Sequence, residues 1–478
     1  MHVALGVRRL RFSIPLGPAY LAAVLEREGH RVSLFEFGSS EKRWLGALSA
    51  DPPGLAAYSV LTGEQNDCLR FHRKLKRLVH VPSILGGPHP TFFPGILLEE
   101  GVDAICIGEA EEAFAEFVAA FAGSGKIPEQ VRNVHVRNAG GETVSNPVRP
   151  LVRDLDTLPF PNRKLFTDAD PVLSLHPVRH FIAQRGCPHD CTFCFNQGYH
   201  RIYGKESRRI RSRDPEAVCA EVDAVRREFP LGMAAFVDDS FAQDPGWLER
   251  FCSVYSRRLR FPFSCNLRPD PVVPRVAPML ADAGCRLAYV GIESGAATSR
   301  KRLGRGMREG TIRASMDALH KHGIRTITEN MVGIPGERFE DALSTLRLNA
   351  ALSPTLANCS IFAPYPGLPL TDLAIRAGSF DGDFGKLEGN FYRTTALEFR
   401  SGAERNRIVN LRAFFSILAR RPGMLPLLSP LLSLPPNRLF EVAGTVADGW
   451  FLRKCLPYRQ PAGATARLLC AYLRLYRS

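Results

Sequence analysis

Short apolar strands alternate with helical segments twice along this 478-residue chain, and this alternation limits the possible folds more than any other feature. In residues 1–125 the strands run into glycines and small polar residues, and helices separate them. Such alternation predicts an α/β domain with a doubly wound parallel sheet, whose ligands bind beyond the carboxyl ends of the strands. The pattern resumes with six strand candidates over residues 179–400, which predicts a partial (β/α)6 barrel with functional loops after its strands.

Two segments differ from these blocks. Residues 126–178 are polar and rich in proline, and we expect an ordered linker there. Residues 401–478 hold 12 Lys and Arg against 3 Asp and Glu, which is most of the net charge of +14. Apolar residues at helical spacing predict a mostly helical C-terminal extension, which either caps the barrel or touches an anionic membrane face. We favour the cap, because amphipathic helices usually pack on their own protein.

Three cysteines are clustered just after the first strand of the second block. Cys187, Cys191 and Cys194 have the spacing C-x3-C-x2-C, whereas the other nine cysteines are scattered. Three thiolates on one loop can ligate three irons of a 4Fe–4S cluster and leave the fourth iron open. A zinc site completed by His189 or His200 is the alternative, but no second C-x2-C pair is present to close it. Because the cysteines form no disulfide framework, we expect a reducing, cytoplasmic compartment.

The open iron of such a cluster can bind S-adenosylmethionine (SAM) and reduce it, which indicates radical chemistry. Carboxylates at strand ends can accept hydrogen bonds from an ammonium group or from ribose hydroxyls. The candidate SAM contacts are Phe193, Asp238, Asp239, Glu293, Ser294, Ile334 and Gly336. The candidate acids or bases of a substrate pocket are Tyr365, Asp239 and Glu337, among which the sequence does not select.

These motifs together resemble the cobalamin-binding-domain radical SAM enzymes over residues 1 to about 400. The residues that carry the resemblance are 86–91, 102–111, the cysteine loop, 291–295, 332–337 and 364–367. The resemblance implies that the first domain is a Rossmann- or flavodoxin-like cobalamin domain. It places the corrin against Ser59, Thr62, Gly86, Gly87, His89, Gly108 and Glu109. The D-x-H-x-x-G motif of cobalamin mutases is absent, so we expect no histidine ligand to cobalt from that motif.

The resemblance implies a methyltransferase with three cofactors, namely a 4Fe–4S cluster, SAM and cobalamin. In this interpretation a 5′-deoxyadenosyl radical takes hydrogen from an unactivated carbon or a phosphinate, and methylcobalamin supplies the methyl group. The substrate would be a small-molecule or lipid-like metabolite, and an external one-electron reductant of the flavodoxin or ferredoxin type would be needed. One alternative is a cobalamin-binding radical SAM ring cyclase or rearrangement enzyme without methyl transfer. Another is a non-catalytic cobalamin or iron–sulfur sensor.

The charge pattern bears on two kinds of partner. We expect no nucleic acid partner, because the basic residues lack the interleaved aromatic platform on which bases stack. No uninterrupted run of about 18 apolar residues is present, so no transmembrane helix is predicted. Residues 401–478 leave room for peripheral contact with the inner face of the membrane.

Overall fold

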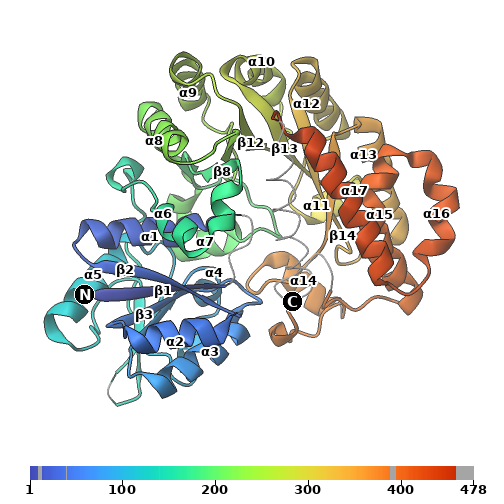
Figure 1. Cartoon of the computed structure of the whole chain (residues 1–478). Helices are drawn as coiled ribbons and strands as arrows, with labels where there is room; N and C mark the ends of the chain where they lie inside the picture. The colour runs from blue at the N-terminus through green and yellow to red at the C-terminus, as the bar shows by residue number, and fades with distance from the viewer. Residues whose placement is uncertain (9–12, 39, 139, 388–394, 459–478) are drawn as a thin grey trace.

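The computed structural model of the protein describes residues 1–8, 13–38, 40–138, 140–387 and 395–458 (Figure 1). The basic loop at 9–12 and the basic, apolar stretch at 459–478 lie outside the described residues. In the described part, two sheets flanked by helices lie side by side, and C-terminal helices pack against the second sheet. This arrangement confirms the predicted order of an α/β domain, a partial barrel and a helical extension.

The first sheet has the strand order β2-β1-β3-β4-β5-β6-β7. Its parallel strands are β1 (His2–Arg8), β2 (Arg31–Phe37), β3 (Leu55–Ser59), β4 (Ser83–Gly86) and β5 (Ala104–Cys106). Helices α1 (Leu16–Arg27) and α5 (Glu111–Ser124) cover one face, and α2 (Glu41–Ala50) and α3 (Gln65–Leu78) cover the other. The order 2-1-3-4-5 is the flavodoxin-like form of the doubly wound sheet, which confirms that prediction.

This sheet continues past residue 125, where the sequence analysis places a linker. β6 (Val134–Arg137) pairs antiparallel with β5, and β7 (Thr143–Val144) pairs antiparallel with β6. Val134 and Val136 are fully buried in the core of the first domain, so burial of alternate residues makes this segment a strand. The rest of 126–178 runs between the domains and contains η2 (Leu155–Thr157), α6 (Lys164–Ala169) and η3 (Pro171–Leu175).

The second sheet has six parallel strands in the order β15-β14-β13-β12-β11-β8. They are β8 (Val178–Phe181), β11 (Met233–Phe236), β12 (Phe263–Leu267), β13 (Cys285–Glu293), β14 (Arg325–Val332) and β15 (Leu356–Ile361). The outer helices are α8 (Pro215–Glu228), α9 (Pro245–Arg258), α10 (Val273–Ala283), α12 (Glu309–Lys321) and α13 (Phe339–Leu352). Each of these strands pairs with the next one along the chain, and the curled sheet is the predicted partial barrel.

Short elements join these layers. On the first-domain side they are α4 (Pro88–Phe92) and η1 (Pro94–Leu98). On the barrel side they are β9 (Gln184–Arg185), α7 (Asn196–Tyr203), η4 (Gly204–Arg208), β10 (Arg211–Ser212), α11 (Ala297–Arg302), α14 (Pro369–Arg376) and η5 (Phe384–Lys386). β9 and β10 form a small antiparallel pair beside the cysteine loop.

The C-terminal extension contains α15 (Gly402–Arg420), η6 (Pro422–Met424), α16 (Leu425–Leu432) and α17 (Arg438–Cys455). Leu411, Phe415 and Leu418 of α15 are buried against the barrel, so this helix is the predicted cap. The end of α17 buries Cys455 against Met233 and against apolar residues of β13, β14 and β15. In the described residues, no helix combines the length and apolar character that a membrane crossing requires.

Candidate active site between the two sheets

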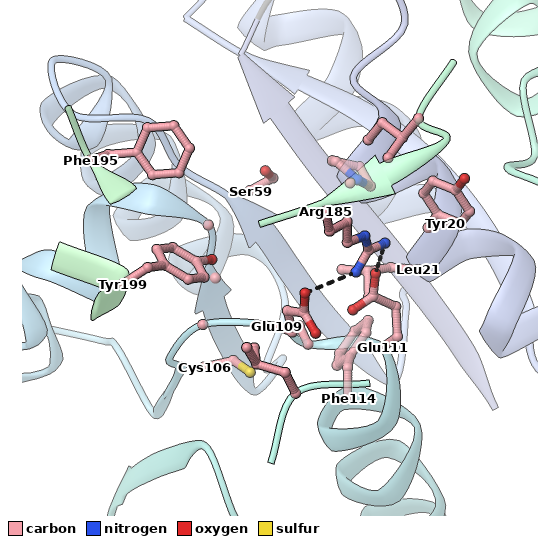
Figure 2. A pocket seen from close by; sticks show the side chains of 18 of the residues that line it. Tyr20, Leu21, Ser59, Cys106, Glu109, Glu111, Phe114, Arg185, Phe195 and Tyr199 are labelled. Carbon is pink, nitrogen blue, oxygen red and sulfur yellow. Dashed lines mark hydrogen bonds and ion pairs between the residues drawn. The ribbon is translucent and has the colours of Figure 1, made fainter. Parts of the chain in front are cut away.

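A cavity of about 360 Å³ lies between the two domains, where both sheets present the carboxyl ends of their strands (Figure 2). Residues at the ends of β1, β3, β4 and β5 line it from the first domain. From the second domain it is lined by the segment after β8, by α7 and by the end of β11. Parallel α/β sheets bind ligands at this end, so the cavity lies where both domains place their functional loops.

The cysteine loop begins with a turn that only glycine fits. Gly186 has φ +101°, and a Cβ there would lie 2.3 Å from the carbonyl oxygen of Arg209. Thr192 anchors the loop, because its amide donates to Leu303 and its hydroxyl donates to the carbonyl oxygen of Arg302 at 2.6 Å. The loop therefore holds its three thiols in place through backbone contacts.

Two arginines supply positive charge beside these thiols. The guanidinium of Arg268 lies 3.7 Å from Sγ of Cys191, and Arg305 lies over the ring of Phe193 at 5.8 Å. Burial raises the pKa of Cys187 to about 11 and that of Cys194 to about 12, so iron binding must displace protons there. Cationic neighbours stabilise the thiolates of a loaded cluster. Neither arginine was predicted from the sequence, although Arg268 directly follows a strand end, as the predicted carboxylates do.

The two histidines of the zinc alternative have other partners. His189 Nε2 lies 3.1 Å from the side-chain oxygen of Gln243, and His200 Nε2 lies 3.1 Å from the carbonyl oxygen of Cys187. Among the described residues, no three His, Cys, Asp or Glu side chains are grouped to hold one metal ion. A structural zinc site needs four closed ligands, whereas a 4Fe–4S cluster takes each thiolate on a separate iron. The donor set therefore fits the cluster.

Asp238 and Asp239, two of the predicted SAM contacts, line the cavity at the end of β11. One oxygen of Asp238 accepts from the amides of Ala183 and Gln184, and the other is buried without a hydrogen-bond partner. Burial raises the pKa of Asp238 to about 7. The pKa of Asp239 is also raised by burial, although a hydrogen bond to Asn196 opposes the shift. The orphaned oxygen of Asp238 is a ready acceptor for a ligand.

Glu293 and Ser294 lie at the end of β13, on the barrel side of the cavity, and do not line it. Glu293 is buried, has the left-handed φ of +65° and accepts from Arg305 at 2.8 Å. Burial raises the pKa of Glu293, and Arg305 partly offsets the shift. The hydroxyl of Ser294 is buried and shares a hydrogen bond with Thr345. The strained, paired Glu293 is therefore the stronger candidate of the two for binding a ligand.

The remaining predicted residues of the barrel lie at the ends of β14 and β15 or in the cysteine loop, outside the described lining of the cavity. Glu337 accepts from the amide of Ile334 at 3.1 Å and closes the turn that contains Gly336, whose φ is +75°. Burial raises the pKa of Glu337 to about 8. Tyr365 is half-buried, and its carbonyl oxygen accepts from the hydroxyl of Thr371. Of the three candidate acids or bases, the cavity contains Asp239.

Five of the seven predicted cobalamin contacts line the cavity, namely Ser59, Gly86, Gly87, Gly108 and Glu109. Thr62 and His89 do not; their side chains lie 3.3 Å apart, and the ring of His89 stacks on Phe93. Burial lowers the pKa of His89 to about 4, which keeps this ring neutral. The described lining residues of the cavity include no histidine.

An ionic cluster joins the first domain to the cysteine loop, as the dashed lines of Figure 2 show in part. Arg185, two residues before Cys187, donates to Glu111 at 2.6 Å and pairs with Glu109 at 3.3 Å. Arg211 donates to Glu109 at 2.7 Å. Burial alone would raise the pKa of Glu109, but the hydrogen bond from Arg211 and the charge of Arg185 outweigh it, and the pKa is lowered. Glu109 therefore binds two arginines of the second domain across the cavity wall.

Aromatic side chains of α7 and of the residue before it form a second wall of the cavity, which was not predicted from the sequence. Phe195 and Tyr199 line it, and Tyr199 stacks on Tyr203 with ring centroids 5.7 Å apart. The hydroxyl of Tyr203 accepts from the amide of Glu109 and lies where a Cβ on Gly108 would stand. Glycines on one side and flat rings on the other suit a large planar ligand, so the residues present fit a corrin.

Known protein families match the two domains of the chain separately. Residues 181–348 match the radical SAM superfamily, and residues 4–118 match the B12 binding domain. An uncharacterized methyltransferase, PH0819, of Pyrococcus horikoshii is 27% identical in an alignment of 376 residues that covers 76% of this chain and 78% of that protein. An anaerobic magnesium-protoporphyrin IX monomethyl ester cyclase of Rubrivivax gelatinosus is 24% identical in an alignment of 373 residues that covers 74% of this chain and 64% of the cyclase.

A solved structure shows the same fold. The radical SAM methyltransferase TsrM of Kitasatospora setae, with cobalamin and a 4Fe–4S cluster bound, aligns with a TM-score of 0.64 at 17% identity. The alignment covers 78% of this chain and 74% of TsrM. Both domain matches occur in the predicted order, on the sheets that enclose the cavity. The chain therefore belongs to the cobalamin-binding radical SAM enzymes, which use a 4Fe–4S cluster, SAM and cobalamin.

Proposed function

We propose that the protein is a methyltransferase that methylates an unactivated carbon or a phosphinate of a small-molecule or lipid-like metabolite. The observation that carries the proposal is the shared cavity, which has the glycine-lined strand ends of the cobalamin domain on one side and Asp238 and Asp239 on the other. Bound together, the three cofactors supply hydrogen-atom abstraction and a transferable methyl group. The part of the chain is to position these groups and to exclude water.

Several residues have distinct tasks in this proposal. Cys187, Cys191 and Cys194 would hold the cluster, and Arg268 and Arg305 would balance its charge. Asp238 would accept a hydrogen bond through its unpaired oxygen, and Asp239 is the candidate acid or base that the cavity contains. An external one-electron reductant of the flavodoxin or ferredoxin type and a cytoplasmic location remain predictions.

A second candidate function is ring closure without methyl transfer. The specific observation in its favour is the similarity to the Rubrivivax cyclase over 74% of this chain. The same cavity and cofactors would serve this reaction, because only the fate of the substrate radical differs. The names of similar proteins thus support both reactions, and the methyltransferase PH0819 is more similar to this chain than the cyclase is.

Product analysis after anaerobic reconstitution tests both candidates. The protein would be loaded with iron, sulfide and cobalamin, and then incubated with SAM and a reductant. 5′-Deoxyadenosine should form in the wild type and be lost in Cys187→Ala, Cys191→Ala and Cys194→Ala. The matched control is Cys219→Ala, which changes a cysteine on the buried face of α8 and should retain 5′-deoxyadenosine formation.

The second product separates the functions. S-Adenosylhomocysteine that appears only with cobalamin supports methyl transfer. 5′-Deoxyadenosine without S-adenosylhomocysteine favours ring closure. Neither product, from a protein with full iron content and with SAM bound, would leave an enzyme that requires its substrate for turnover or a non-catalytic sensor.

A further inference from the structure

Helix α17 presents an apolar face to solvent. Leu439, Val442, Val446 and Trp450 are 79%, 52%, 67% and 58% exposed. Their spacing of three or four residues places them along one side of the helix. Single exposed apolar residues are ordinary, but a contiguous apolar stripe marks an interaction surface.

The opposite side of α17 is fixed on the protein. A Cβ on Gly444 would lie 2.1 Å from the carbonyl oxygen of Ala413, so α15 and α17 approach at backbone distance there. Phe440 packs on Phe414 with ring centroids 5.0 Å apart, and Cys455 is fully buried at the end of the barrel. The helix cannot turn to bury its outer stripe without losing these contacts.

The fully exposed charges of α17 are all positive. Arg438 stands at one end of α17, and Arg453 and Lys454 stand at the other, all exposed. The two acidic residues of the helix, Glu441 and Asp448, are only half-exposed. The ammonium group of Lys454 lies 5.3 Å from the ring centroid of Trp450. The outward face thus combines an apolar middle with cations at both ends.

The charge pattern selects the occupant of this face. Residues 459–478 carry four arginines and no Asp or Glu, so they would add like charge if they covered it. A second copy related by a two-fold axis would bring the arginines and lysine of both helices together. An anionic lipid surface takes up Leu, Val and Trp at its acyl boundary and pairs cations with its headgroups. We propose that α17 docks the enzyme on the surface of an anionic bilayer.

This proposal goes beyond the proposed function and does not depend on it. α15 is the cap that the sequence analysis favours, and α17 provides the membrane contact that it left open. The two interpretations of the extension therefore apply to different helices.

Vesicle co-sedimentation of the full-length protein tests the proposal. The wild type should sediment with vesicles that contain phosphatidylglycerol and remain in the supernatant with pure phosphatidylcholine. Val446→Asp should lower the bound fraction at least tenfold, because it places a carboxylate in the middle of the stripe. The matched control is Leu98→Asp on the first domain, where the leucine is 69% exposed, and it should bind as the wild type does. Circular dichroism would show that both variants are folded.

Tryptophan fluorescence gives an independent reading. The chain has three tryptophans, and Trp44 and Trp247 are buried, so acrylamide quenching reports mainly on Trp450. Vesicles with phosphatidylglycerol should reduce this quenching in the wild type.

Any of the following results would overturn the proposal. The first is that the wild type does not sediment, or that Val446→Asp sediments equally well. The second is that Trp450 is protected without vesicles and becomes accessible after deletion of residues 459–478, since those residues would then cover the face. The third is a dimer that Val446→Asp dissociates.

Discussion

Replacing Glu109 with Gln should loosen the contact between the cobalamin domain and the cysteine loop. Glu109 is 12% exposed; it accepts from Arg211 at 2.7 and 3.0 Å and pairs with Arg185 at 3.3 Å. Removing one partner of a fully buried ion pair costs about 3–5 kcal/mol. These groups are partly solvated, and Arg185 retains its ion pair with Glu111 in the variant. We therefore expect the substitution to destabilise this contact by about 2 kcal/mol.

Hydrogen exchange can measure this cost locally. A loss of about 2 kcal/mol in the opening free energy makes exchange about 30-fold faster. We expect that acceleration in the amides of residues 184–212 and little change in β1 to β4. The matched control is Glu112→Gln on α5, since Glu112 is 56% exposed and pairs with Arg149 at 3.4 Å. Such a surface pair is worth about 0–1 kcal/mol. Equal exchange in the two variants would refute the assigned role of the ionic cluster.

Three further changes test the site. Cys194→Ala should abolish the visible absorption of the reconstituted cluster while far-ultraviolet circular dichroism is unchanged; retained absorption would exclude Cys194 as a ligand. Gly108→Ala should lower the free energy of unfolding by about 2 kcal/mol, because residue 108 has a φ of +75° and the added Cβ would lie 1.8 Å from the hydroxyl of Tyr203. An unchanged midpoint of urea unfolding would contradict this. Burial raises the pKa of Asp238 to about 7. Between about pH 4 and pH 7 the folded protein therefore retains a proton that the unfolded chain releases, and the free energy of unfolding should fall as the pH rises through this range. Asp238→Asn should flatten that part of the profile in urea unfolding, and an unaltered slope would show that other groups cause it.

Much of the fold could be predicted from the sequence because its signals are local. Apolar strands that end in glycine, each followed by a helix, predict parallel sheets wherever they occur. All six barrel strands and the five parallel strands of the first sheet arise in this way, whereas the order of the strands is seen only in the structure. The hairpin of β6 and β7 was not predicted, because Val134 and Val136 are isolated apolar residues in a polar stretch. Their burial depends on the core of the first domain, against which they pack.

Some features of the candidate site could likewise be predicted from local sequence, and others could not. The cysteine triplet and the glycines at the strand ends could be identified without a structure, because ligand spacing and backbone freedom are properties of short segments. Only the tertiary structure brought Arg268 and Arg305 to the thiols and joined Glu109 to Arg185 and Arg211. The tertiary structure also left Thr62 and His89 outside the lining of the cavity and turned one face of α17 to solvent. The physical reason is that charge pairing and burial depend on distances between segments far apart in the chain, and only the packing of both sheets fixes those distances.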